Sequence, residues 1–137
     1  MKSSEPLADV RQMLRFVIGG TAVAAGADKF FNLLTDWEQY LAPVARRRIP
    51  IEPRNFMRLV GIIEMAVGGT ILSGRSRVGG YIAGAWLLGI AANLIANRDY
   101  DIAARDVNIA AGAFALARMS GTKRSIRQPE RALEDVA

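Results

Sequence analysis

The stretch VGGYIAGAWLLGIAANLIA, from Val78 to Ala96, decides the fold because it contains no charged residue and no proline. As an α-helix it would extend for roughly 28 Å, about the thickness of the hydrocarbon core of a bilayer. Asn93 is its only strongly polar side chain. Since a core helix of a soluble protein rarely runs this long without a polar face, the stretch predicts a transmembrane helix.

Charged residues are segregated along the 137-residue chain. They concentrate before Phe16, between Asp36 and Arg58, and after Arg118, and apolar runs separate these regions. This distribution is typical of an integral membrane protein. The net charge is +5, but the basic residues flank apolar segments and no nucleic-acid-binding motif accompanies them. We therefore expect the bilayer, and not nucleic acid, to be the partner of the basic residues.

The chain contains no cysteine and no histidine. Their absence excludes disulfides, thiolate chemistry, zinc sites of the usual kind, and haem or copper held by histidine. We predict no metal site and no covalently bound cofactor. A diffusible quinone is compatible with this composition, whereas a haem largely is not.

Three further apolar segments complete the predicted fold, which is an all-α, integral membrane, antiparallel four-helix bundle. They are about Met13 to Leu34, Arg54 to Ser73, and Ile102 to Met119. The first contains AVAAGA, which also resembles a signal-peptide cleavage site, but the preceding acidic residues favour a retained helix. The bundle would occupy residues 13–119, between a polar lead (1–12) and a polar tail (120–137).

The long first connection, residues 35–53, predicts a short interfacial helix. Trp37, Tyr40, Leu41 and Val44 recur at i, i+3, i+4 and i+7, which gives one apolar face. We expect Trp37 and Tyr40 at headgroup level, with a break at Pro43 and an extended chain from Pro50 to Pro53. The basic run 46–48 would contact lipid phosphates or an acidic partner.

Gly80 and Gly84 form a G-x-x-x-G pattern in the third apolar segment. Such glycines let helix backbones approach closely, either inside the bundle or across a homodimer interface. Four spans would place both termini on the same side. Lys and Arg are slightly more numerous there, which predicts cytoplasmic termini.

Polar side chains fall inside all four predicted spans, and such residues mark a functional site by default. Helix positions place them in one layer between the midplane and the side away from the termini; they are Asp28, Lys29, Glu64, Asn93, Arg105 and Asp106. We expect Arg105 to pair with Glu64 or Asp28, and Lys29 to reach the interface or to pair with Asp106. The layer would fix helix register, line a pocket for a headgroup, quinone or small anion, or conduct protons or ions.

The order and spacing of several motifs resemble the DoxX family of small four-helix bacterial membrane proteins. The motifs are GADKFFNLL, DWEQYLAP, GIIEMAVGGTIL, RSRVGGYIAGAWLL, IAANLI and YDIAARDVNIAAGAFALAR, between Arg15 and Met119. The resemblance implies a four-helix membrane bundle with cytoplasmic termini. Family members are associated with quinone-linked sulfur oxidation, terminal-oxidase accessory subunits and complexes that handle thiol and oxidative stress. The family pattern falls on Lys29, Glu64, Arg105 and Asp106.

Two functions therefore compete at the level of sequence. The first is an accessory or quinone-interacting subunit of a membrane redox system, with redox-complex subunits or further copies of the chain as partners. The second is a non-catalytic structural or assembly protein whose buried charges only fix helix register. A small transporter is disfavoured because the sequence shows no internal repeat. No catalytic residue is predicted.

Overall fold

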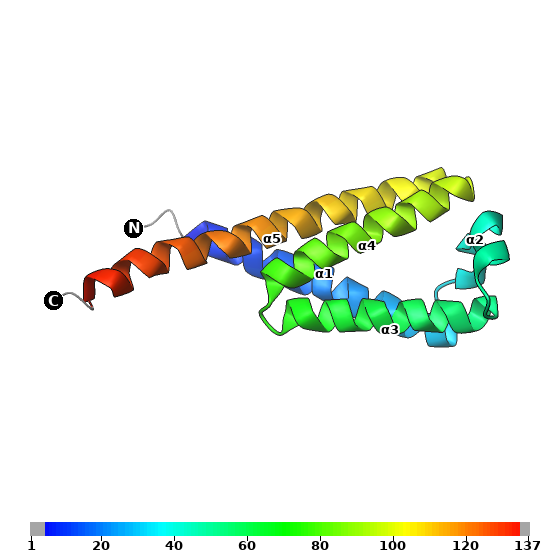
Figure 1. Cartoon of the computed structure of the whole chain (residues 1–137), viewed down its shortest axis with the longest axis horizontal. Coiled ribbons are helices and arrows are strands. Elements are labelled where there is room, and N and C mark those ends of the chain that lie inside the picture. The colour runs from blue at the N-terminus through cyan, green and yellow to red at the C-terminus, as the bar shows by residue number, and fades with distance from the viewer. Residues whose placement is uncertain (1–4, 135–137) are drawn as a thin grey trace.

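The computed structural model describes residues 5–134, with side chains from Glu5 to Gly121. Within this part the chain is entirely helical and contains no strand (Figure 1). The elements are α1 (Glu5–Phe31), the 3₁₀ helix η1 (Trp37–Tyr40), α2 (Pro43–Arg48), α3 (Pro53–Leu72), α4 (Ser76–Ala96) and α5 (Tyr100–Glu134).

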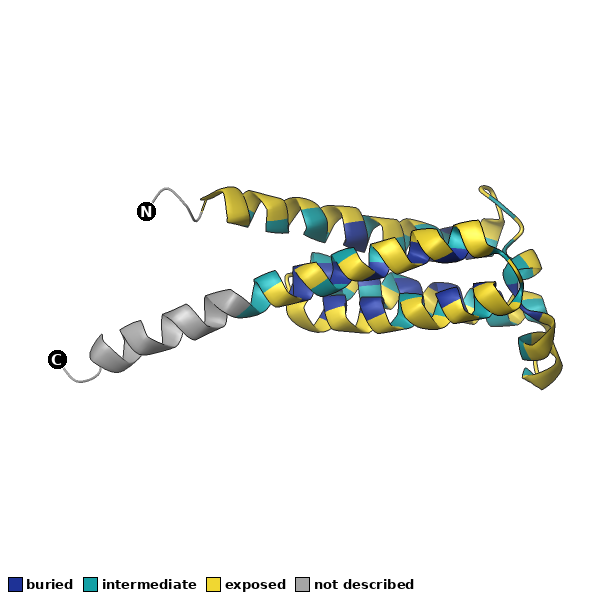
Figure 2. Ribbon diagram, turned by 90° about the horizontal axis from the view of Figure 1, so that it is seen from above, coloured by how far each residue is buried: buried dark blue, intermediate teal, exposed yellow. Residues whose placement is uncertain are grey.

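The four long helices form two antiparallel pairs. α1 packs mainly against α3, and α4 packs mainly against α5. The pairs meet at one end, which we call the turn end because it holds the α3–α4 turn, and they diverge toward the other (Figure 1). That second end, the loop end, holds η1, α2 and the α4–α5 turn. Buried residues lie on the faces that the helices turn toward one another (Figure 2).

A seam of glycines brings the backbones of α1 and α3 into contact. A Cβ added to Gly61 would lie 2.5 Å from the carbonyl oxygen of Gly26, and one added to Gly68 would lie 2.6 Å from that of Gly19. No side chain fits at these positions, because real Cβ atoms do not approach backbone oxygens so closely. The seam therefore holds the two helices at their shortest practical separation.

The G-x-x-x-G pattern of α4 packs inside the chain, against α5. A Cβ on Gly80 would lie 2.7 Å from the carbonyl oxygen of Ala113, and one on Gly84 would lie 2.6 Å from the ring of Phe114. Of the two interpretations of this motif, the structure bears out close packing within the bundle.

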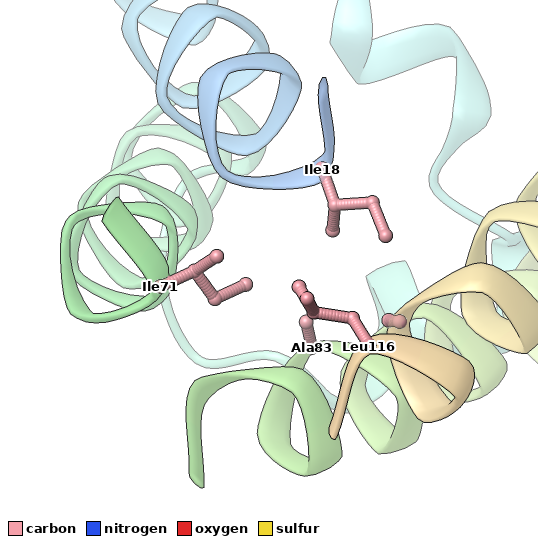
Figure 3. Packing of buried hydrophobic residues seen from close by; sticks show 5 residues of the cluster. Ile18, Ile71, Ala83 and Leu116 are labelled. Carbon is pink, nitrogen blue, oxygen red and sulfur yellow. The ribbon is translucent and has the colours of Figure 1, made fainter. Parts of the chain in front are cut away.

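The apolar core lies toward the turn end, where both pairs meet. Ile18, Ile71, Ala83, Ala113 and Leu116 form one buried cluster, and four of them are labelled in Figure 3. Ile71 and Leu116 are completely buried. Among the described helices, α3 and α4 are long and apolar enough to cross a membrane.

Three boundaries differ from the sequence predictions. α1 begins at Glu5, inside the predicted polar lead, and α5 continues past Met119 to Glu134, into the predicted tail. The interfacial helix expected around Trp37–Val44 is two short helices, because the backbone is extended at Leu41 and Ala42. Residues 1–4 and 135–137 of the lead and tail lie outside the described part.

Two of the three prolines expected to interrupt helical structure begin helices instead. Pro43 and Pro53 are the first residues of α2 and α3. The first helical position does not need an N–H donor, and the fixed φ of proline already suits a helix there. The basic run 46–48 lies in α2, and Pro50 lies in the connection between α2 and α3.

Replacing Gly61 with alanine will destabilise the protein, because the new Cβ would collide with the carbonyl oxygen of Gly26. The expected cost is ~1–3 kcal/mol, as for other overpacked sites. The matched control is Gly69→Ala in the same helix, where an added Cβ meets nothing within 4 Å. Thermal unfolding of the purified proteins checks this: equal melting temperatures for both variants would contradict the seam.

Candidate functional site

A cavity of about 670 Å³ occupies the space where the two helix pairs diverge. All four long helices and the first loop contribute to its wall, which is mainly apolar. Leu34 and Arg105 line it and are themselves exposed, so the cavity reaches the molecular surface. Five of the six residues predicted for the polar layer line it: Lys29, Glu64, Asn93, Arg105 and Asp106.

Lys29 and Glu64 form a buried ion pair between α1 and α3. The ammonium Nζ donates to the carboxylate Oε2 at 2.6 Å, and the two side chains are only 5% and 11% exposed. The pair lies beside the glycine seam, since a Cβ on Gly61 would lie 3.1 Å from the Cβ of Lys29. The close approach of α1 and α3 is therefore what lets these two side chains meet.

The indole of Trp37 covers the ammonium of Lys29. Nζ lies 3.8 Å from the centroid of the ring, which is a cation–π contact. The indole N–H donates to Oδ2 of Asp28 at 2.7 Å. Trp37 thus lies inward over the ion pair, and the headgroup level expected for it stays a prediction.

Asp28 lies in the last turn of α1, where its side chain bonds the backbone that follows the helix, and it does not line the cavity. Its carboxylate accepts hydrogen bonds from the backbone N–H groups of Leu33 and Leu34, at 3.0 and 3.2 Å. Asn32, at the turn, has a positive φ of 50°. Asp28 therefore fixes the end of the helix and the position of Trp37, and its predicted pairing with Arg105 is wrong.

Arg105 pairs with its neighbour Asp106 instead. Its Nε donates to Oδ1 of Asp106 at 2.9 Å; the Asp106 side chain is 5% exposed and that of Arg105 is 55% exposed. Asp106 and Glu64 both line the cavity. The predicted Arg105–Glu64 and Lys29–Asp106 pairs do not form, because α1 packs on α3 and α5 packs on α4.

Asn93 holds the first loop against the loop end of α4. Its amide NH₂ donates to the carbonyl oxygen of Tyr40 at 2.7 Å, and its amide oxygen accepts from the N–H of Ala42 at 3.1 Å. Asn97, one turn further along α4, donates to the carbonyl oxygen of Gln39 at 3.0 Å. The loop is thereby fixed across the open end of the helix pairs, and Tyr40 lines the cavity.

Trp86 is a cavity residue that the sequence analysis missed. Its indole nitrogen is buried and has no hydrogen-bond partner among the described residues. Trp86, Ile90 and Asn93 all line the cavity, and their i, i+4, i+7 spacing placed them on one face of α4. That spacing, with polar Asn93 as its last member, was the signal available in the sequence.

The site therefore combines an apolar wall with a compact polar region. Lys29 neutralises Glu64, and Arg105 neutralises Asp106. The indole N–H of Trp86 makes no hydrogen bond of normal geometry, and it lies close to the carboxylate of Glu64. No group of three or more acidic or other metal-binding side chains capable of holding a metal ion occurs in the described part of the chain. The site therefore places paired charges and an indole N–H next to an apolar volume.

Comparison with known proteins gives no relative: no family model, no curated protein and no solved structure matches the chain. The resemblance to the DoxX family stays a prediction.

Breaking the ion pair on one side will destabilise the protein more than removing both partners. Lys29→Met or Glu64→Met alone leaves a buried charge uncompensated, which costs ~3–5 kcal/mol, whereas the double variant leaves none. The free energies of unfolding of the four proteins form a double-mutant cycle. Arg48→Met, at an exposed position, is the control. Additive losses in the double variant would show that the two side chains are not coupled.

Asn93→Ala will release the first loop, because it removes both side-chain hydrogen bonds to the loop backbone. The local cost is ~1–3 kcal/mol, since the N–H of Ala42 is left buried and unsatisfied. The measurement is the rate of trypsin cleavage after Arg46, Arg47 and Arg48, which should rise at least tenfold. Asn108→Ala is the matched control, because Asn108 bonds only within its own helix. Equal cleavage rates would contradict the role of Asn93.

Proposed function

We propose that the chain is an integral membrane protein whose four long helices cross the bilayer as an antiparallel bundle. Two of them, α3 and α4, are long and apolar enough to do so. Large apolar side chains are exposed on all four, including Val17 on α1, Ile62 on α3, Ile82 on α4 and Val107 on α5. Exposed apolar surface on every long helix is unfavourable in water and favourable in lipid, which supports this placement.

In this arrangement η1 and α2 lie at the membrane surface, and the start of α1 and the end of α5 lie on the opposite side (Figure 1). The slight excess of Lys and Arg on the side of the termini favours the cytoplasm for that side. The resemblance to the DoxX family implies the bacterial inner membrane as the location. α1 and α5 carry more charges than α3 and α4. Several of these lie toward the cavity or in ion pairs, as with Lys29, Arg105 and Asp106.

The cavity, in this proposal, binds a quinone, and the chain serves as an accessory or quinone-interacting subunit of a membrane redox system. The observation that carries the proposal is an apolar volume of about 670 Å³ with a buried polar region on its wall. Such a combination suits a ligand with an apolar ring and tail and a few polar atoms. The resemblance to the DoxX family implies the same class of ligand.

The polar groups have the chemistry that a quinone requires. The indole N–H of Trp86 and the exposed guanidinium of Arg105 can donate hydrogen bonds to quinone carbonyl oxygens. The carboxylates of Glu64 and Asp106 can exchange the protons that accompany quinone reduction. The quinone itself supplies the redox chemistry.

A structural or assembly role is the second candidate, and the completeness of the internal contacts favours it. Lys29 has both Glu64 and Trp37, Asp28 has Trp37 and two backbone N–H groups, and Asn93 uses its amide on the first loop. Such a cluster would fix helix register without any ligand.

A quinone-binding measurement separates these two candidate functions, and the tryptophans of the chain can report binding by their fluorescence. Its two tryptophans, Trp37 and Trp86, both line the cavity. Titration of the purified protein with the short-chain quinone ubiquinone-1 should therefore quench tryptophan fluorescence saturably. Gly89→Leu should weaken binding at least tenfold, because Gly89 lines the cavity and an added side chain would project into open space.

Gly69→Leu is the matched control, because Gly69 does not line the cavity and also has open space around it. It should bind quinone as the wild type does. Unsaturable quenching, or equal affinity of both variants, would favour the structural role. Washing the cell membranes with alkaline carbonate before purification tests membrane insertion, since a protein that crosses the bilayer stays in the membrane pellet.

A further inference from the structure

A second pocket lies at the turn end and shares no residue with the cavity. Its volume is about 170 Å³, and it is lined mainly by polar atoms from α1, the α3–α4 turn, α4 and α5. The lining residues are Arg11, Gln12, Arg15, Gly74, Ser76 and Ser120. Four separate segments of the chain thus converge on one small polar volume.

The charge of this pocket is positive. Arg11 and Arg15 stand at i and i+4 on α1, so both guanidinium groups lie on one face. No lining residue carries a carboxylate. Neither arginine forms an ion pair with any described side chain. Two neighbouring like charges destabilise one another unless an anion lies between them, so the pocket is electrostatically suited to an anion.

Arg15 is held in place and still has donor capacity. Its Nη2 donates to the carbonyl oxygen of Leu72, the last residue of α3, which positions the guanidinium at the rim of the pocket. Its Nε is buried and has no hydrogen-bond partner among the described residues. A buried guanidinium N–H without an acceptor is costly, and an anion oxygen would satisfy it.

The backbone adds to the positive potential. α4 begins at Ser76, which is buried and lines the pocket, and no side chain caps this helix. The N–H groups of a first helical turn attract anions. The hydroxyl groups of Ser76 and Ser120 donate to the carbonyl oxygens of Ile71 and Leu116. The donors left for an anion are therefore the guanidinium groups, the Gln12 amide and the start of α4.

We propose that this pocket binds a phosphate group. A tetrahedral oxyanion matches the forked donors of guanidinium groups and the N–H groups at the start of a helix. The phosphate belongs either to an anionic lipid headgroup or to a small soluble molecule. The site is independent of quinone binding, because it lies at the opposite end of the helices from the loop end.

Two titrations test the proposal and separate the two sources. In the first, native mass spectrometry of the protein in nanodiscs of mixed phosphatidylglycerol and phosphatidylcholine measures which lipid is retained. In the second, isothermal titration with sodium phosphate, against sodium chloride at equal ionic strength, measures binding of the free anion in neutral detergent. Retention of phosphatidylglycerol alone identifies a headgroup site, and heat with phosphate identifies a site for a soluble phosphate.

Arg11→Gln is the test variant, because Arg11 forms no ion pair with any described side chain and its removal breaks none. It should reduce retention or affinity at least tenfold while leaving the melting temperature unchanged. Arg47→Gln, an exposed arginine at the loop end, is the control for the loss of one positive charge. The proposal is overturned if neither ligand binds the wild type, or if Arg11→Gln and Arg47→Gln behave alike.

Discussion

The ion pair between Lys29 and Glu64 is the interaction on which the loop end of the molecule depends. Each of these charges would be costly to bury alone, and together they are tolerated only with good geometry and additional contacts. The ring of Trp37 supplies one such contact by covering the ammonium, and Asp28 holds that ring. Since Asp28 also ends α1, the end of a helix, the path of the loop and the ion pair form one connected unit.

The packing of the long helices in two close pairs explains why the molecule contains a cavity. Glycines bring α1 and α3 together along Gly19, Gly26, Gly61 and Gly68, and Gly80 and Gly84 do the same for α4 and α5. Between the pairs, close packing is confined to the turn end, where Ile71 and Leu116 are buried. Toward the loop end the pairs diverge, and their facing side chains surround open volume.

Much of the fold could be predicted from the hydrophobic runs in the sequence, because a helix in an apolar environment needs a long uncharged stretch. The predicted segment Val78–Ala96 became α4, Ser76–Ala96, and Arg54–Ser73 became α3, Pro53–Leu72. The depth of the polar layer in a membrane stays a prediction, but distance along the helices did group its members at a similar level. Five of its six members surround one cavity.

The pairing of the charged side chains could not be predicted from the sequence, because it depends on which helices touch. Arg105 was expected to reach Glu64, but Glu64 is on α3, which packs on α1 and so receives Lys29. The signal in the sequence that α1 packs on α3 was a pair of glycines at i and i+7 on each of these two helices. The contacts of Trp37 with Lys29 and Asp28 were equally hidden, because an aromatic residue in a loop does not reveal which side chains it will cover.

The divergence of the helix pairs has a mechanical consequence. They are joined at the α3–α4 turn, where Gly74 has a φ of +96° and nothing lies within 4 Å of its would-be Cβ. α3 and α4, of 20 and 21 residues, are arms of about 30 Å. A rotation of one degree at the turn therefore changes their separation at the loop end by about 0.5 Å. The width of the cavity is therefore sensitive to the geometry of a turn at the far end of the molecule.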